Sequence, residues 1–139
     1  MVGIGTAVAR RGTRGANDPA TMMRPGEEVE VYVYRGIVDM RKSINGLSTI
    51  VEQELGLNPF APRLFVFCNR QRDKIKILYW ERSGFVLWYK RLEKARFPWP
   101  RRDKERVLEM TGRELNWLLD GVDLFQLRPH EELTYKSVA

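Results

Sequence analysis

Residues 69–92, with the sequence NRQRDKIKILYWERSGFVLWYKRL, interleave basic, aromatic and aliphatic side chains and form the strongest candidate for a binding surface. Cations along a groove hold the phosphates of a nucleic acid, and exposed aromatic rings stack on its bases. The alternative is an ordinary hairpin whose lysine stems cover apolar sheet while their ammonium groups remain in water. On the first interpretation, the contacting residues are Arg70, Arg72, Lys74, Lys76, Trp88, Lys90 and Arg91.

A second basic feature, Asp39-Met40-Arg41-Lys42-Ser43, lies where the apolar pattern predicts the start of a helix. Arg41 and Lys42 would then stand in the first helical turn, where a cation opposes the helix dipole at a cost of about 0.3–1 kcal/mol. Free amides, the dipole and two cations that converge on one point suit a phosphate group. The alternative is that Arg41 pairs with an acid such as Glu27 or Glu30.

The sequence contains no recognisable set of catalytic residues. One cysteine, Cys68, and one histidine, His130, do not suffice for a zinc finger or a convincing Cys–His nucleophile pair. There is no phosphate-binding glycine loop of the Walker type and no Ser–His–Asp set. Four carboxylates have ordinary roles as caps, turn residues or charge partners: Asp39, Asp73, Glu81 and Asp103. We expect no enzyme activity, no cofactor and no metal; a metal-dependent nuclease using Asp39 or Asp73 is the remote alternative.

The formal net charge of +6 is concentrated in the middle of the chain. Residues 63–106 contain 14 Lys and Arg against 5 Asp and Glu, whereas the remainder contains 10 against 13. A basic centre on a near-neutral frame favours a polyanionic partner, most often nucleic acid. No apolar run approaches the roughly 20 residues that span a bilayer. Cys68 is expected to be a buried packing residue, and a single cysteine suits a reducing cytoplasm. We therefore expect a cytoplasmic protein with no membrane partner.

The elements that position these features begin with a strand at residues 29–34, whose valines alternate on one side. Asp39 is a suitable N-cap for a helix over residues 40–55, which carries one apolar stripe and stops at Gly56. A second strand at residues 64–69 is apolar enough to be buried on both faces. Strand, helix and strand in about 40 residues predict a βαβ unit with a parallel pair.

Two strands at residues 74–80 and 85–92 are predicted to form a hairpin around a three-residue loop, Arg82-Ser83-Gly84, with Gly84 left-handed. A two-residue turn on Ser83 and Gly84 would scatter lysines among both apolar sets. The preferred register groups Ile75, Ile77, Tyr79, Phe85, Leu87 and Tyr89 on one face. The opposite face then carries Lys74, Lys76, Leu78, Trp80, Val86, Trp88 and Lys90. Lys76 and Lys90 would share one exposed edge, so replacing both with alanine should barely change stability.

A four-residue loop at 70–73 would add Leu64, Val66 and Cys68 to the apolar face, against the helix. Phe65 and Phe67 would lie on the far face, covered by the C-terminal segment. That segment contains a capping box from Thr111 to Glu114, a short helix that ends at Gly121, and the stretch Phe97-Pro98-Trp99-Pro100, expected to lie extended across the sheet.

The expected fold class is therefore α+β: a mixed sheet of about four strands, built from a βαβ unit followed by a β-hairpin, with one long helix on one face and a short C-terminal helix. We expect a disordered N-terminal extension at residues 1–24, a single domain at 25–128 and a loose tail at 129–139.

Three blocks are specific together: DMRKSINGL at 39–47, KIKILYWE and GF at 74–85, and KRLEKARFPWP at 90–100. The first lies within VYVYRGIVDMRKSINGL at 31–47, and the other two lie within LFVFCNRQRDKIKILYWERSGFVLWYKRLEKARFPWP at 64–100; a further stretch is ELNWLLDGVDL at 114–124. They resemble the small accessory protein, often labelled TnpB or Orf2-like, of the insertion sequence sixty-six transposon family, over residues 24–128. The resemblance implies a part in transposition beside a separate, larger transposase that holds the catalytic acids. It supplies no agreed activity and no catalytic residues for this chain.

The blocks include both basic features, which favours them as functional surfaces. We expect a non-catalytic accessory protein that binds DNA, such as the element ends, through Arg41, Lys42 and the basic residues of the hairpin. The alternative is an interaction module that docks onto the transposase with its Trp- and Phe-rich face.

Overall fold

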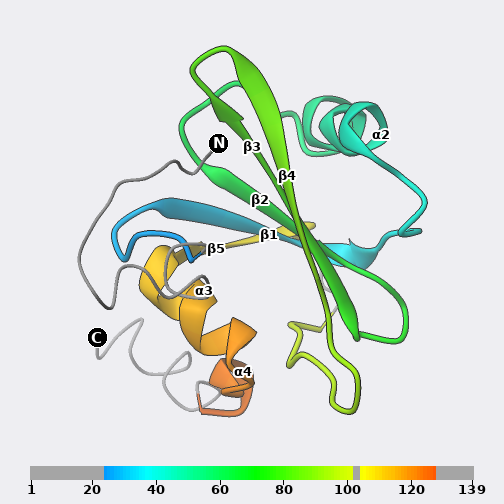
Figure 1. Cartoon of the computed structure of the whole chain (residues 1–139), viewed down its shortest axis with the longest axis vertical. Helices are drawn as coiled ribbons and strands as arrows, with labels where there is room; N and C mark the ends of the chain where they lie inside the picture. The colour runs from blue at the N-terminus through cyan, green and yellow to red at the C-terminus, as the bar shows by residue number, and fades with distance from the viewer. Residues whose placement is uncertain (1–23, 102–103, 128–139) are drawn as a thin grey trace.

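The computed structural model describes residues 24–101 and 104–127, which form a five-stranded mixed sheet in the order β4-β3-β2-β1-β5 (Figure 1). The strands are β1 (Glu30–Ile37), β2 (Leu64–Cys68), β3 (Lys74–Glu81), β4 (Gly84–Arg91) and β5 (Val107–Thr111). β1 and β2 are parallel, and all other neighbours are antiparallel. The predicted α+β class, parallel pair and hairpin are confirmed. β5 was not predicted, because it is a five-residue edge strand in which the apolar alternation is too short to stand out.

The helix between β1 and β2 is shorter than predicted. It begins at Ile44 as α2 (Ile44–Thr49) and continues as a π-helical turn, η2 (Ile50–Glu54). Asp39 is not its N-cap: the Asp39 carboxylate accepts a hydrogen bond from the Arg41 N–H, which forms a tight turn ahead of the helix. Gly56 ends the helix with a φ of +65°, as predicted.

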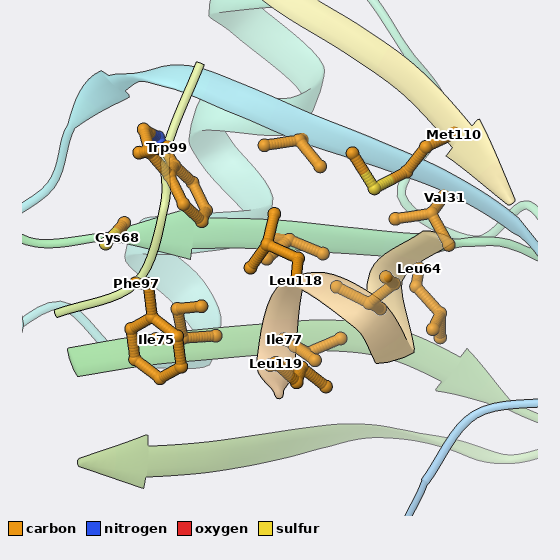
Figure 2. Packing of buried hydrophobic residues seen from close by; sticks show 13 residues of the cluster. Val31, Leu64, Cys68, Ile75, Ile77, Phe97, Trp99, Met110, Leu118 and Leu119 are labelled. Carbon is orange, nitrogen blue, oxygen red and sulfur yellow. The ribbon is translucent and has the colours of Figure 1, made fainter. Parts of the chain in front are cut away.

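Two apolar clusters bury the two faces of the sheet. On one face, α3 (Gly112–Leu119) and the segment around Phe97 and Trp99 pack over the inward side chains of the strands (Figure 2). On the other face, α2 and η2 cover Phe65, Phe67 and Leu78. The predicted extended path of residues 97–100 across the sheet is therefore confirmed.

The predicted faces for the two covering elements were wrong: the helix between β1 and β2 packs on the face assigned to the C-terminal segment, and the C-terminal segment packs on the other face. Leu64, Val66 and Cys68 face α3, and Phe65 and Phe67 face α2. All five residues of β2 are buried and apolar, so the sequence of β2 does not indicate which of its two faces packs against which element. The choice depends on β1, where Tyr32 stacks on Phe65 and Tyr34 packs against Phe67, on the side that α2 closes.

The four-residue loop at 70–73 is confirmed, because Cys68 pairs with Ile75 and the Asn69 N–H donates to the Lys74 carbonyl. The predicted β3–β4 loop is wrong. Glu81 pairs with Gly84 across a two-residue turn in which Arg82, with a φ of 55°, takes the left-handed conformation. Because side chains alternate, this one-residue difference moves every β4 side chain to the other face. The predicted register was preferred because it placed the apolar side chains of the hairpin on one face. Both faces of the sheet are covered by other elements, so apolar side chains can be buried in either register.

The end of the sheet where β1 begins is closed by backbone contacts. The Gly112 N–H donates to the Val29 carbonyl, and the Arg113 N–H donates to the Glu27 carbonyl. A Cβ atom at position 112 would collide with the Gly26 carbonyl oxygen, so the packing requires glycine there. The Thr111–Glu114 capping box and the end of α3 at Gly121 are confirmed, and a short α4 (Leu124–Leu127) follows.

Some expectations fall on residues that the structure does not describe. The predicted N-terminal extension, apart from Arg24, and the predicted tail lie outside the described residues, as do Asp103 and His130. Within the described part of the chain, no helix is long and apolar enough to cross a membrane.

Candidate nucleic-acid interface

The strand order brings three basic loops to one end of the sheet. β1, β2 and β4 end there and β3 begins there, since Cys68 is paired with both Ile37 and Ile75, and Lys74 is paired with Arg91. The chain leaves the sheet on this side, at the right and lower right of Figure 1. We call residues 38–43, 69–74 and 90–96 the basic end. The loops are separated in sequence, and only the sheet makes them neighbours.

The basic end carries nine cationic side chains and three carboxylates. Each carboxylate already has a cationic partner: Asp39 with Arg41 at 2.7 Å, Asp73 with Lys74 at 3.4 Å, and Glu93 with Arg91 at 3.0 Å. The remaining six cations form no ion pair with any described residue: Lys42, Arg70, Arg72, Lys90, Lys94 and Arg96. The structure therefore gathers an uncompensated positive charge at one end of the molecule.

The loop before α2 presents Arg41 on its surface. The Arg41 side chain is 91% exposed, and its guanidinium donates to both Asp39 carboxylate oxygens. These hydrogen bonds lower the pKa of Asp39 to about 2, because they favour the charged form. The predicted partners Glu27 and Glu30 are not used. The predicted placement of Arg41 and Lys42 in a first helical turn is wrong, because α2 begins only at Ile44; their binding of a phosphate stays a prediction.

The loop between β2 and β3 is organised by one buried polar side chain, Asn69. Its amide nitrogen donates to Gln71 and to Asp73, and its amide oxygen accepts from the Asp73 and Lys74 N–H groups. These bonds hold Arg70 and Arg72 outward, where both are exposed. This role of Asn69 was not predicted. The signal was present, because an Asn that directly follows an apolar strand is a frequent organiser of turns.

Lys76 joins the two basic features that the sequence analysis singled out. Its Nζ atom donates to the Met40 carbonyl at 2.8 Å and to the Lys42 carbonyl at 2.9 Å. The same ammonium lies 5.7 Å from the centre of the Tyr89 ring, as in a cation–π contact. Lys76 is therefore a partly buried support for the 39–42 loop, and two of its three donors are already occupied. It is not the free surface lysine that was predicted.

Lys90 and Trp88 lie on the opposite face from Lys76. The observed register pairs Ile75 with Lys90 and Ile77 with Trp88, and Trp88 packs against the cluster under α3. The predicted edge shared by Lys76 and Lys90 is therefore wrong. Tyr89 stands in the row that was assigned to Trp88, beside Lys76 and two residues from Arg91. Lys94 and Arg96, both exposed, extend the basic end and were not proposed, although they lie in the basic middle of the chain.

The candidate acids and the cysteine are engaged in structural contacts. Asp39 is held by Arg41, and Asp73 by Asn69 and Lys74, which lower the pKa of Asp73. Burial raises the pKa of the Cys68 thiol to about 12, which agrees with its predicted role as a packing residue. Within residues 24–101 and 104–127, no group of three or more His, Cys, Asp or Glu could hold a metal ion.

Comparison with known proteins gives one family. The family model described as IS66 Orf2 like protein matches residues 29–129. The chain is 33% identical over 102 residues to uncharacterized protein y4hO of Sinorhizobium fredii, which covers 73% of this chain and 88% of the relative. It is 32% identical over 102 residues to uncharacterized protein y4jC of the same organism, with 73% and 86% covered. No solved structure matches significantly.

Proposed function

The chain belongs to the IS66 Orf2-like protein family, and we propose that it serves insertion-sequence transposition as a non-catalytic accessory protein that binds DNA with its basic end. Membership links the chain to insertion sequences. The proposed partners are the DNA of the element, including its ends, and the separate transposase. The proposed contacts are those of the three loops, with Lys76 as a support and Lys90 reaching from the far face.

One observation carries the proposal: all three carboxylates of the basic end are already paired, and six cations remain. Like charges held together on a folded surface repel one another, and a polyanion relieves that repulsion. The cations lie on three loops and not on a single helix. Phosphate contacts of this kind position a protein on DNA without reading its sequence.

Binding through phosphate contacts predicts how the affinity for DNA falls as the salt concentration rises. Each phosphate that a cation neutralises releases counterions, and log K falls with log salt at a slope of about −0.9 per phosphate on duplex DNA. Six unpaired cations allow a slope of up to about −5. An interface made of aromatic side chains would respond little to salt, because it displaces few counterions.

The test is a salt series of binding to two duplexes, one from the element end and one of random sequence, measured by fluorescence anisotropy on the full-length chain. We expect both duplexes to bind with similar slopes, and the variant Arg70→Ala/Lys94→Ala to reduce the magnitude of the slope by roughly two. The control is Arg82→Asn, which removes an exposed cation at the other end of the sheet and breaks no ion pair between described residues. Affinity that is independent of salt, or equal slope losses in the two variants, would contradict the proposal.

A second candidate function rests on a different surface. Phe60 is 52% exposed and packs edge-on against Trp80 at 5.0 Å and beside Phe85 at 5.3 Å between ring centres. This aromatic cluster lies at the β3–β4 turn, at the far end of the sheet from the basic end. Exposed aromatic groups are common anchors of protein interfaces. The corresponding test is capture of the transposase of the same element by wild type and by Phe60→Ser; equal capture would exclude this surface.

A further inference from the structure

Tyr89 is an exposed aromatic side chain on β4, directly before residues 90–96 of the basic end. The solvent-exposed fraction of Tyr89 is 49%. The other exposed large apolar or aromatic residues in the described part of the chain are Ile37, Phe60, Trp117 and Val122. Among these, Phe60 belongs to the aromatic cluster at the far end, and Trp117 lies on α3. Among the exposed aromatic residues of the described part of the chain, Tyr89 is therefore the one next to the unpaired cations.

The exposure of Tyr89 follows from the register of β4 and the length of the helix. Leu87, two residues earlier in the same row, packs in the cluster that α2 and η2 cover. The helix starts only at Ile44, so the preceding loop, and not the helix, lies beside the Tyr89 end of the row. The predicted helix from residue 40 would have lain one turn closer to this position.

Lys76 fixes the ring in place. The Lys76 ammonium is held by the Met40 and Lys42 carbonyls and lies over the Tyr89 ring at 5.7 Å from its centre. One cation therefore ties the ring to the backbone of the loop that carries Arg41 and Lys42. A ring that is held in this way loses little conformational entropy when a flat ligand stacks on its exposed surface.

Two exposed cations belong to the segments next to this ring, Lys42 to the loop that Lys76 holds and Arg91 to the same strand as Tyr89. Lys42, exposed and without an ion pair among the described residues, projects from the loop that Lys76 holds. Arg91 follows in the same row of β4, and its ion-pair partner is Glu93, whose side chain is 71% exposed. Exposed pairs of this kind contribute little to stability, so a phosphate can replace the Glu93 carboxylate at little cost.

We propose that Tyr89 is a stacking platform for an unpaired base, and that the basic end therefore binds single-stranded DNA more tightly than duplex DNA. The proposal rests on the proposed function and specifies its ligand. Every base has a π-face, so stacking is tolerant of sequence, and phosphates on either side of the stacked base reach Lys42 and Arg91. In a duplex the bases are already stacked on one another, which leaves only the phosphate contacts.

The experiment uses the full-length chain, a single-stranded oligothymidylate and a blunt duplex of random sequence. The variants are Tyr89→Leu, which keeps apolar volume and removes the ring, and Tyr89→Phe, which keeps the ring. We expect Tyr89→Leu to weaken single-strand binding by roughly fivefold to a hundredfold, with the salt slope and duplex affinity unchanged. Tyr89→Phe should bind like wild type. The matched control is Trp117→Leu, which removes a ring that is 44% exposed and lies on α3.

The outcomes separate this inference from the proposed function. If duplex binding keeps its salt slope while Tyr89→Leu leaves single-strand binding unchanged, the stacking platform is excluded and DNA binding by the basic end remains. Equal losses on single strands and duplexes would also exclude it, since they indicate a disturbed loop. If wild type binds neither probe, the proposed function fails and this inference fails with it. A thermal melt of each variant verifies that the fold is intact.

Discussion

The two ends of the sheet use their charged side chains in opposite ways. At the end where β1 begins, ion pairs join segments that are remote in sequence: Arg24 with Asp120, Arg113 with Glu27, and Arg63 with Glu30. At the basic end, each pair joins residues only one or two positions apart: Asp39 with Arg41, Asp73 with Lys74, and Arg91 with Glu93.

This difference indicates which ion pairs form only in the folded chain. A pair between distant segments requires both segments to be in their native positions. A pair between near neighbours exists without the fold and can exchange its carboxylate for another anion. At the first end these exposed pairs accompany the close approach of Gly112 to Gly26 and the capping box of α3. The basic end leaves its cations available for a ligand.

The largest effect is expected at the closed end, from Gly112→Ala. The new Cβ would meet the Gly26 carbonyl oxygen, so two backbone segments must separate. We expect a loss of about 3 kcal/mol in the free energy of unfolding, at the upper end for overpacking. Urea denaturation measures it. The control is Gly84→Ala at the β3–β4 turn, where a Cβ has open space; a similar loss in both variants would contradict the close approach at Gly112.

The next effect concerns the one buried polar side chain of the basic end. Asn69→Ala leaves the Asp73 and Lys74 N–H groups without their acceptor. We expect a loss of about 2–3 kcal/mol, since each orphaned buried group costs about 1–3 kcal/mol and the loop can relax partly toward water. Urea denaturation of Asn69→Ala beside Asn58→Ala, an exposed Asn in another loop, makes the comparison. Stability equal to wild type would show that the loop does not need Asn69.

Lys76 and Lys90 are expected to differ in their contribution to stability, because Lys76 supports a loop through hydrogen bonds and Lys90 does not. Lys76→Met keeps the stem but removes the bonds to the Met40 and Lys42 carbonyls, and we expect it to lose about 1–3 kcal/mol. Lys90→Met should stay within about 0.5 kcal/mol of wild type. Thermal and urea unfolding report both values. Equal stability of the two variants would show that the hydrogen bonds of Lys76 to the 39–42 loop do not stabilise the fold.

Two arginines with the same backbone conformation stand at opposite ends and form a matched pair. Arg72 has a φ of 63° and Arg82 a φ of 55°, and asparagine tolerates both. We expect Arg72→Asn to weaken DNA binding by roughly threefold to tenfold and to reduce the salt slope by about one. Arg82→Asn should change neither quantity. Stability should be alike in the two variants, and equal DNA affinity would remove the distinction between the two ends.

The smallest effect is the pH dependence of Asp39. Its pKa is lowered from 3.8 to about 2 in the folded chain, so its contribution to stability is fully present above about pH 4 and is lost as the pH falls toward 2. Asp39→Asn keeps an acceptor for the Arg41 N–H but removes the charge. The difference in Tm between wild type and Asp39→Asn should therefore shrink between about pH 5 and 2. A constant difference across this range would contradict the role of the Arg41 contact.

Several elements could be predicted because their signals are local. The valines of β1, the stripe of α2, the left-handed Gly56 and the Thr111–Glu114 capping box each depend on residues a few positions apart. The basic loops were likewise visible, since their charges are read directly from the sequence. Asn69 and Tyr89 were not recognised, because their roles depend on what surrounds them: the buried loop in the first case and the register of β4 in the second.

The sequence by itself determined the α+β class, the βαβ unit, the hairpin, the concentration of positive charge and the resemblance to the family. Only the tertiary structure decided which cover lies on which face, because β2 is buried on both sides and carries no preference. It also decided which cations share a surface. The register of β4 depends on a turn that places Arg82, not Gly84, in the left-handed conformation, and that choice is made by packing on both faces of the sheet. Periodicity alone leaves that register open, because either one buries apolar side chains, whereas only one sets Tyr89 beside Lys76 at the basic end.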